Sequence, residues 1–495
     1  MCGVIGVIGP AQQPHWSDRA AYEAYRGLLT LQHRGQDAAG ILTYDFTKRR
    51  FLQTKNLGLV ATVFNQENLD SLSGDMAIGH TRYATVGSDG VEDLQPMVAP
   101  IPYGVGMVHN GNIVNYYQLA DELKTKEKTQ LLSDNDIEVM LQLWSKNLVS
   151  NWVGDKRDFD FDMAVNASEV LLDRVEGAFA LLTMVADAGL LALRDPDGIR
   201  PLVLGRKKLN ENDQYAYCVC SETLTLNFLG YEYYRDVQPG ELIYISKEGE
   251  LHSKQLKKSS KKSHCMFEWI YFSGAESTID SKSVYGARLE LGKVLARRVK
   301  DHISKNSISP DFVCPVPDTS RTAAIALAEE TKLPYREGLI KNRYIQRSFI
   351  LNEQEAREKA VELKLSPVRS EIEGKNILLV DDSVVRGTTS KKIISLLKRN
   401  GAKNVTLAIT CPPLRYACYY GIDFPNSESL IANNKDEEQI AKYVGADSVI
   451  YLDEDDVKEA IGIPELCMAC VNNKYPTNVE SAKEFSKRRE NNRKS

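Results

Sequence analysis

Cys2 occupies a position that suits covalent chemistry, directly behind Met1 and in front of Gly3. Removal of Met1 leaves a cysteine with a free α-amine. An α-amine with a pKa of about 7.7–8.0 can act as the general base for the thiol of the same residue. The alternative is an inert small residue on a buried strand, and the tripeptide alone does not decide between the two.

Three later segments carry polar groups that an attack on a carbonyl carbon requires. The guanidinium fork of Arg82 can hold an α-carboxylate through two hydrogen bonds. Asn110 and Gly111 combine a side-chain amide donor with a backbone N–H that a ligand can approach closely, the pair needed for an oxyanion hole. Asp136 opens a predicted helix; it favours the helix dipole there, and it could also hold a substrate ammonium.

The sharpest signal begins with an apolar strand over 377–380 that ends in Asp381 and Asp382. Ligands bind at the carboxyl ends of strands in open α/β folds. The following loop enters a helix, whose free N–H groups and positive dipole end suit a phosphate. Paired acids beside such a loop fit a sugar phosphate, bound directly or through Mg²⁺. The loop residues that we expect to bind it are Ser383, Arg386, Gly387, Thr388 and Thr389.

The predicted elements divide the chain in two. Residues 2–245 alternate short apolar runs, turn residues and helical periodicity, which indicates layered α and β structure. Residues 246–264 are polar and lysine-rich, and we expect a solvated linker. Residues 265–475 alternate short buried strands with helices, which is typical of βαβ units and a parallel sheet. A charged tail, 476–495, is expected to fray.

Composition excludes several classes of protein. The 495 residues are 43% hydrophobic and 26% charged, with a net charge of -5, so no basic field attracts nucleic acid or an anionic membrane. The most apolar stretch, 178–193, is interrupted and falls short of the roughly 20 residues of a membrane span, and it predicts a hairpin. The nine cysteines are too scattered for a disulfide framework. With no leader evident, we expect a cytoplasmic protein.

Together with the run Leu31-Gln-His-Arg-Gly-Gln-Asp-Ala-Ala-Gly40, the first-half residues resemble the glutaminase domain of N-terminal-nucleophile amidotransferases. The resemblance implies a layered αββα fold in which Cys2 attacks the carboxamide of glutamine. It also implies that Asn110 and Gly111 stabilise the oxyanion, that a thioester and ammonia form, and that water then releases glutamate. The residues implied to bind glutamine are Arg34, Arg82 and Asp136, with Arg34 and Asp37 supporting the pocket.

The motif at Asp381 and Asp382 is similar to the phosphoribosyl pyrophosphate signature of type I phosphoribosyltransferases. It lacks the Gly-x-x-x-x-Gly-Lys spacing of a nucleotide P-loop, which disfavours an ATPase. The segment 316–321 occupies the place of the pyrophosphate loop of that fold. The resemblance makes Thr319 a further magnesium contact, and the choice between Thr319 and Ser320 stays open.

The segment 341–369 lies between these two loops and has an excess of basic residues. This excess suits a lid that orders when pyrophosphate binds. An ordinary exposed helix with mixed charges is an equal alternative for 353–365. Lys341 and Arg343 are the residues of this segment that we expect to contact phosphate.

A glutaminase followed by a phosphoribosyltransferase resembles the amidophosphoribosyltransferase family, in its iron-sulfur branch. The resemblance implies that ammonia displaces pyrophosphate at ribose C1 and gives 5-phosphoribosylamine, the first committed product of purine synthesis. Ammonia is mostly protonated in water, so a dry passage should join the two sites. The family further implies bound Mg²⁺, a homodimer or homotetramer, and feedback inhibition by purine nucleotides, with neither nucleic acid nor membrane as a partner.

Four cysteines lie in settings similar to the cluster ligands of that branch. Four thiolates suit a 4Fe-4S cluster, for which zinc or no metal at all is the alternative. The implied ligands are Cys265, Cys418, Cys467 and Cys470. The other four cysteines outside the catalytic centre, Cys218, Cys220, Cys314 and Cys411, are expected in the core.

The sequence departs from the family in two places. Only Met1 precedes Cys2, where the iron-sulfur branch commonly has a longer propeptide, so autocatalytic processing is not required. Ser273-Gly-Ala-Glu-Ser277 stands where many members have Arg-Pro-Asp-Ser, which leaves the role of this turn open. A sugar isomerase partner would lack the paired acids, and an asparagine synthetase would need an ATP pyrophosphatase loop. The remaining alternative is a regulator that binds phosphoribosyl pyrophosphate without turnover, or an iron-sulfur sensor.

Overall fold

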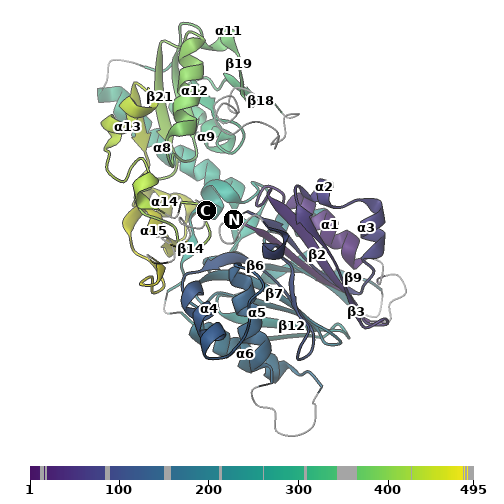
Figure 1. Cartoon of the computed structure of the whole chain (residues 1–495). Helices are drawn as coiled ribbons and strands as arrows, with labels where there is room; N and C mark the ends of the chain where they lie inside the picture. Colours follow the sequence, from purple (N-terminus) through teal and green to yellow (C-terminus); the bar gives the residue numbers. More distant parts are fainter. Residues whose placement is uncertain are drawn as a thin grey trace.

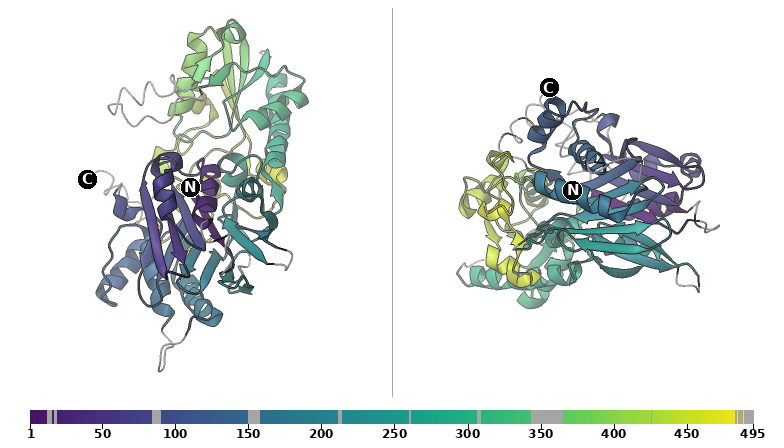
Figure 2. Two further views of the ribbon diagram at one scale, coloured as in Figure 1. Left: turned by 90° about the vertical axis from the view of Figure 1, so that its right-hand side faces the viewer. Right: turned by 90° about the horizontal axis from the view of Figure 1, so that it is seen from below.

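The computed structural model describes residues 1–11, 16, 19–83, 90–149, 158–210, 214–259, 261–305, 309–342, 365–424, 426–482, 484 and 488. These residues form a layered αββα part from the first half and an α/β part from the second (Figure 1). The fold class expected from sequence is therefore confirmed. The N-terminus lies where the two parts meet, as the side view also shows (Figure 2). None of the helices described here is long and apolar enough to cross a membrane.

Two antiparallel sheets pack face to face in the first part. The seven-stranded sheet has the order β11-β9-β10-β1-β4-β2-β3, and the six-stranded sheet has the order β13-β12-β8-β7-β6-β5. The bounds of the first are β1 (Gly3–Ile8), β2 (Ala38–Asp45), β3 (Arg50–Leu57), β4 (Met76–Arg82), β9 (Val203–Lys208), β10 (Tyr215–Cys220) and β11 (Glu232–Asp236). Those of the second are β5 (Met97–Ala99), β6 (Val105–Ile113), β7 (Gly177–Val185), β8 (Gly189–Arg194), β12 (Glu241–Ser246) and β13 (Leu251–Gln255). The predicted hairpin over 178–193 is confirmed as β7 and β8.

Helices cover the outer face of each sheet (Figure 1). The first sheet carries α1 (Ala20–Thr30), α2 (Val60–Val63), α3 (Gln66–Ser71) and α7 (Thr223–Leu229). The second carries α4 (Tyr116–Thr125), α5 (Asp136–Asn147) and α6 (Phe161–Arg174), and a short 3-10 turn, η1 (Val91–Asp93), precedes β5.

The amino acids of β1 explain its central position. Ile5 and Val7 pack against the helix layer, whereas Val4 and Ile8 pack between the sheets, as alternation along a strand requires. A Cβ at Gly6 would lie 3.1 Å from Leu190 Cδ2, so glycine lets the second sheet approach closely. Because both faces are covered, the whole strand is apolar, and Cys2 is held at its beginning.

The predicted linker is too long. Residues 251–255 form β13, which pairs with β12 as an exposed edge of the second sheet. Sequence analysis missed this strand because an edge strand with polar, lysine-bearing positions has the same composition as a solvated linker. The chain then crosses to the second part through β14 (His264–Cys265), a π-helix η2 (Glu268–Phe272), and the hairpin β15 (Thr278–Ile279) and β16 (Lys282–Ser283).

A parallel sheet with the order β17-β20-β21-β22 forms the centre of the second part. The strands are β17 (Phe312–Pro315), β20 (Asn376–Asp381), β21 (Asn404–Ile409) and β22 (Ser448–Tyr451). The surrounding helices are α8 (Val284–Lys305), α9 (Arg321–Thr331), α11 (Arg369–Ile372), α12 (Thr388–Arg399), α13 (Glu437–Val444), α14 (Glu454–Ile461) and α15 (Ala469–Asn472), with the 3-10 turn η3 (Ser427–Ser429). A small strand, β23 (Leu466–Cys467), returns to pair with β14.

The ends of the predicted lid are paired with each other. β18 (Leu339–Lys341) runs antiparallel to β19 (Leu365–Pro367), so the segment leaves and rejoins the domain at one place. Arg343 and the rest of 343–364 lie outside the described residues. In the charged tail, Ala482 is fully buried, so the chain remains docked beyond residue 476.

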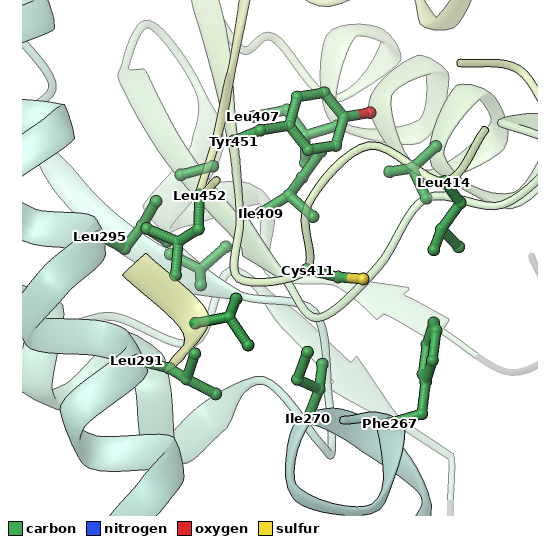
Figure 3. Packing of buried hydrophobic residues seen from close by; sticks show 14 of the residues in the cluster. Phe267, Ile270, Leu291, Leu295, Leu407, Ile409, Cys411, Leu414, Tyr451 and Leu452 are labelled. Carbon is green, nitrogen blue, oxygen red and sulfur yellow. The ribbon is translucent and has the colours of Figure 1, made fainter. Parts of the chain in front are cut away.

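One hydrophobic cluster joins the two parts. Met1, Val114 and Ile199 of the first part pack with Ile270 of η2 and with the core of the second part. Figure 3 shows Cys411 inside this cluster, among side chains from η2, α8 and the parallel sheet. Within the described residues, a continuous apolar core therefore spans the junction between the two parts.

The contact of α8 with α9 generates a prediction on stability. A Cβ at Gly292 would lie 2.1 Å from the carbonyl oxygen of Ala323, so Gly292→Ala must push the helices apart. We expect a loss of about 1–3 kcal/mol, measured as a lower melting temperature. Gly286→Ala in the same helix meets only Ser283 at 3.5 Å and should stabilise slightly, because alanine favours helix. Equal melting temperatures for the two variants would contradict this packing.

Candidate active sites

Cys2 lies at the start of β1 with its thiol against Tyr83. The Sγ atom is 3.5 Å from Tyr83 N, which donates to it, and 3.7 Å from Tyr83 O. Burial raises the pKa of the Cys2 thiol, and the Tyr83 backbone and the Arg82 charge offset this only in part. A thiol with a raised pKa is protonated near neutral pH, so this cysteine needs a base within reach.

Met1 is buried beside this thiol, only 1% exposed, and contacts the guanidinium of Arg200. Burial lowers the pKa of the Met1 α-amine to about 5, and the charges of Arg200 and Arg34 act in the same direction. An amine at this position is therefore mostly neutral at pH 7. The assignment of the α-amine of Cys2 as the base stays a prediction, because it requires the removal of Met1.

Asn110 and Gly111 lie on β6 directly opposite this end of β1. Asn110 Oδ1 accepts a hydrogen bond from Cys2 N at 3.2 Å, which fixes the orientation of the amide. Asn110 Nδ2 is buried and has no partner among the described residues. Gly111 has φ of 153°, and a Cβ there would lie 1.9 Å from Ala178 O, so the position requires glycine. The structure thus brings a free, oriented amide donor next to the thiol.

Arg82 and Asp136 are both buried near Cys2. Arg82 ends β4, and its carbonyl accepts a hydrogen bond from Asp37 N at 3.0 Å. Asp136 Oδ2 accepts one from Ile113 N at 3.0 Å, and Oδ1 is 3.3 Å from His109 Nε2. The structure therefore ties Asp136 to the strand that carries Asn110.

The structure places Arg34 in the supporting role that the resemblance implies rather than in direct contact with glutamine. Its Nε contacts Glu222 Oε1, and its Nη2 donates to Glu268 Oε2 at 2.7 Å and to Ser273 Oγ at 3.0 Å. A guanidinium engaged in this way supports the pocket from behind rather than touching a substrate. The residue after Arg34 packs directly on the pocket. A Cβ at Gly35 would lie 2.5 Å from the carbonyl carbon of Arg82, so the two backbone segments are in contact.

Glu222 is a functional residue that sequence analysis missed. It accepts hydrogen bonds from His33 at 2.8 Å, from Ser277 Oγ at 2.7 Å and from Gly274 N at 2.8 Å, besides its contact with Arg34. Burial alone would raise the pKa of Glu222, but Arg34 and His33 outweigh it and hold the pKa at about 2. The turn 273–277, whose role was open, thus anchors this carboxylate and Arg34.

In the second part, Asp381 and Asp382 end β20 at the carboxyl edge of the parallel sheet. Asp382 accepts hydrogen bonds from the Thr319 hydroxyl and, at 2.9 Å, from Ser383 Oγ. Burial and mutual repulsion raise the pKa of Asp381 well above its usual range, and burial also raises that of Asp382. Two neighbouring carboxylates that repel each other in a buried place are stabilised when a divalent cation binds to them. The Ser320 hydroxyl donates to Val316 O instead, so Thr319 is the hydroxyl that faces the acids.

The loop after the acids is shaped to enter a helix. Gly387 has φ of 74° and precedes α12, and a Cβ there would lie 2.6 Å from Ile431 Cδ1. No side chain in the described part of the chain caps this helix, so its first N–H groups can face a phosphate. The nearby Arg386, Thr388 and Thr389 are exposed.

Lys341 reaches the loop between β17 and α9. Its Nζ donates to Asp318 Oδ2 at 2.7 Å, which ties the base of the predicted lid to the predicted pyrophosphate loop. The expected contact of Arg343 lies outside the described residues.

The four cysteines of the predicted cluster are buried in one neighbourhood. Cys265 and Cys467 are direct partners in the β14–β23 pair. The carbonyl of Cys470 accepts from Arg415 N and Tyr416 N, two residues before Cys418. Burial raises the pKa of Cys265 to about 12, and its neighbour Cys418 adds to the rise. Within the described ranges, no three His, Cys, Asp or Glu side chains group closely enough for one metal ion. The four cysteines expected in the core are buried, as predicted.

Comparisons with known proteins cover both parts. A model of the glutamine amidotransferase domain matches residues 80–226, and a model of the phosphoribosyl transferase domain matches residues 286–439. The amidophosphoribosyltransferase of Archaeoglobus fulgidus is 42% identical, covering 97% of this chain and 98% of its own. That of Escherichia coli is 40% identical, covering 93% of this chain and 88% of its own.

Solved structures agree with these relatives. One described as the allosteric regulatory enzyme of purine biosynthesis is 37% identical, with a TM-score of 0.83 and 97% of both chains covered. The glutamine phosphoribosylpyrophosphate amidotransferase from B. subtilis, complexed with ADP and GMP, is also 37% identical, with a TM-score of 0.82 and coverage of 97% of this chain and 98% of its own. With two sites of matching chemistry in one chain, these full-length similarities show that the chain belongs to the amidophosphoribosyltransferase family.

Proposed function

We propose that this chain releases ammonia from glutamine at Cys2 and uses it to displace pyrophosphate from phosphoribosyl pyrophosphate, giving 5-phosphoribosylamine, the first step of purine biosynthesis. The observation that carries the residue assignment is the unpartnered Asn110 Nδ2, held beside the thiol by the hydrogen bond between Asn110 Oδ1 and Cys2 N. A buried amide donor without a partner costs free energy unless a ligand satisfies it. An oxyanion formed on the glutamine carboxamide would accept from it.

The glutaminase reaction then follows from the groups around Cys2. The free α-amine takes the thiol proton, the thiolate adds to the carboxamide carbon, and Asn110 with the Gly111 N–H stabilises the oxyanion. The α-ammonium returns this proton to the amide nitrogen as the intermediate collapses, so that ammonia leaves and a thioester remains, which water hydrolyses to glutamate. Arg82 and Asp136 orient the carboxylate and amine of glutamine, while Arg34 holds the pocket wall.

In the transferase site, Asp381, Asp382 and Thr319 would hold Mg²⁺, which neutralises charge on the departing pyrophosphate. The uncapped start of α12 and the residues Ser383, Arg386, Gly387, Thr388 and Thr389 bind the 5-phosphate. Lys341, with Arg343, meets the pyrophosphate. The apolar cluster between the parts supports a passage that would keep water away from the ammonia.

We include a 4Fe-4S cluster on Cys265, Cys418, Cys467 and Cys470 in this proposal. A single zinc ion needs its ligand atoms about 2.3 Å from one point, whereas each thiolate of a four-iron cluster binds a different iron. Burial raises the pKa of the Cys470 thiol, and the nearby thiols of Cys418, Cys411, Cys467 and Cys265 each raise it further, so the proposed ligands share one buried neighbourhood. Such a cluster would cross-link β14, β23 and the 415–418 segment. Its role is structural, because Cys2 and the two aspartates account for the chemistry.

Regulation and assembly belong to the same proposal. The B. subtilis relative was solved with ADP and GMP, which supports purine nucleotides as feedback inhibitors of this chain. We also propose a homodimer or homotetramer in the cytoplasm. Neither nucleic acid nor membrane is a proposed partner.

The central prediction separates the two activities. Cys2→Ala should lower glutamine-dependent release of pyrophosphate at least about a thousandfold, because the nucleophile is lost. Activity with ammonium chloride in place of glutamine should persist, because the transferase site is intact. The measurement follows glutamate and pyrophosphate together at saturating Mg²⁺. Cys218→Ala, a buried cysteine in the same sheet, serves as the control and should keep both activities. Binding of phosphoribosyl pyrophosphate without turnover by the unaltered protein would favour the regulator instead.

Gly387→Ala tests the phosphate loop. The left-handed backbone and the contact with Ile431 should raise the KM for phosphoribosyl pyrophosphate about tenfold, measured with ammonia as the nitrogen source. Glutaminase activity should not change. Gly374→Ala has a nearly equal φ of 73° but no neighbour within 4 Å, so it reproduces the backbone strain alone and should leave KM unchanged. An unaltered KM in Gly387→Ala would contradict the assignment.

The cluster is tested by the composition of protein purified without oxygen. We expect about four iron and four acid-labile sulfide per chain. Cys467→Ser should lose most of both, whereas Cys314→Ser, a buried cysteine on β17, should retain them. Zinc without sulfide would establish the rival metal, and the absence of any metal would remove this part of the proposal.

A further inference from the structure

Arg288, near the start of α8, lies between the two candidate sites. It is only 4% exposed. Its Nε donates to Trp269 O at 2.9 Å, and its Nη2 donates to Tyr271 O at 3.1 Å and to Ser273 O at 2.7 Å. The carbonyl groups at the end of a helix need hydrogen-bond donors from outside the helix. The guanidinium of Arg288 donates to three such carbonyls of η2 and its end. The position of η2 and of the following turn therefore depends on this side chain.

The segment that Arg288 holds is the one that binds Arg34. Glu268 Oε2 accepts from Arg34 Nη2 at 2.7 Å, and Ser273 Oγ both accepts from Arg34 and donates to Glu268. Arg34 precedes Gly35, which packs on the backbone of Arg82. Next to Arg82, Tyr83 contacts the thiol of Cys2. A continuous set of contacts thus connects Arg288 to the glutaminase site.

The helix that carries Arg288 packs against the transferase site. Gly292 of α8 lies against the backbone of Ala323 in α9, whose carbonyl oxygen a Cβ at Gly292 would meet at 2.1 Å. The α9 helix begins two residues after Thr319, whose hydroxyl contacts Asp382. The helix of Arg288 is therefore fixed against the helix that follows the Thr319 loop.

We propose that Arg288 is a positioning residue that keeps the glutaminase and transferase sites in register, by clamping the 269–273 carbonyls to the helix that packs against the transferase loops. The inference rests on the proposed function and extends it. Without the clamp, η2 and its contact with Arg34 are no longer fixed relative to the transferase site. Ammonia released at Cys2 then escapes to water before it reaches ribose C1.

The variant Arg288→Lys distinguishes the proposed positioning role from an effect of the positive charge alone. Lysine keeps the positive charge near Asp382, but its single ammonium cannot reproduce the planar fork that donates to three carbonyls. Arg298→Lys is the matched control, since Arg298 lies on the same helix and pairs with Asp453 and Asp456 of the α14 cap, away from both sites. Both variants are compared with the unaltered full-length protein by melting temperature.

The test measures glutamate and pyrophosphate in the same reaction, together with ammonia-dependent transferase activity. We expect the ratio of glutamate to pyrophosphate in Arg288→Lys to rise at least about twofold, while the ammonia-dependent rate and its KM for phosphoribosyl pyrophosphate are retained. Arg298→Lys should keep the ratio of the unaltered protein. An unchanged ratio in Arg288→Lys, or a fall of both activities in parallel, would overturn the inference.

Two further results keep the outcome clear. If Arg288→Lys does not fold, Ser273→Ala decides, because it removes the hydroxyl that binds both Arg34 and Glu268, leaves the direct Arg34–Glu268 bond alone to connect Arg34 with η2, and should raise the ratio in the same direction. An unchanged ratio in Ser273→Ala would then sink the inference. If the unaltered protein releases no pyrophosphate with either nitrogen source, the proposed function itself fails, which is distinct from a failure of Arg288.

Discussion

The burial of Arg34 between Glu222 and Glu268 is the constraint on which the rest of the molecule depends. The two carboxylates come from different parts of the chain, one after β10 and the other in η2, and all three side chains are almost fully enclosed. Removal of one partner from a buried ion pair typically costs about 3–5 kcal/mol, because a charge is left without compensation. The glutaminase part therefore cannot shift against the start of the transferase part without a large penalty.

The residues of each site lie at the ends of β-strands near this junction. β1 and β6 present Cys2 and Asn110 from two packed sheets, and β20 presents Asp381 and Asp382 from a third. Glycine is required at Gly111 and Gly387, where a side chain would collide with a neighbour and φ is positive. An apolar cluster packs between the parts, beside the buried ion pairs of Arg34.

Sequence analysis predicted the features whose chemistry is concentrated in short motifs. Cys2 and the Asp381–Asp382 loop could be found because strand, acids, glycine and hydroxyls follow one another within a few residues. Glu222 and Glu268 were missed because their partner, Arg34, is 188 and 234 residues away, and no local pattern signals such a pair. For the same reason the sequence could not separate the two roles expected of Arg34, glutamine binding and support of the pocket. The edge strand β13 was taken for linker because exposed polar strands lack an apolar face.

The position of β1 in the middle of its sheet has a consequence for the order in which the protein matures. β1 is hydrogen-bonded on one side to β4 and on the other to β10, which ends at Cys220. At roughly 5–20 residues per second, a ribosome takes about 10–45 s to synthesise that far. In the folded chain Met1 is only 1% exposed, so an aminopeptidase acting after folding would not reach it. The removal of Met1 that we propose would therefore have to precede the pairing of β1 with β10.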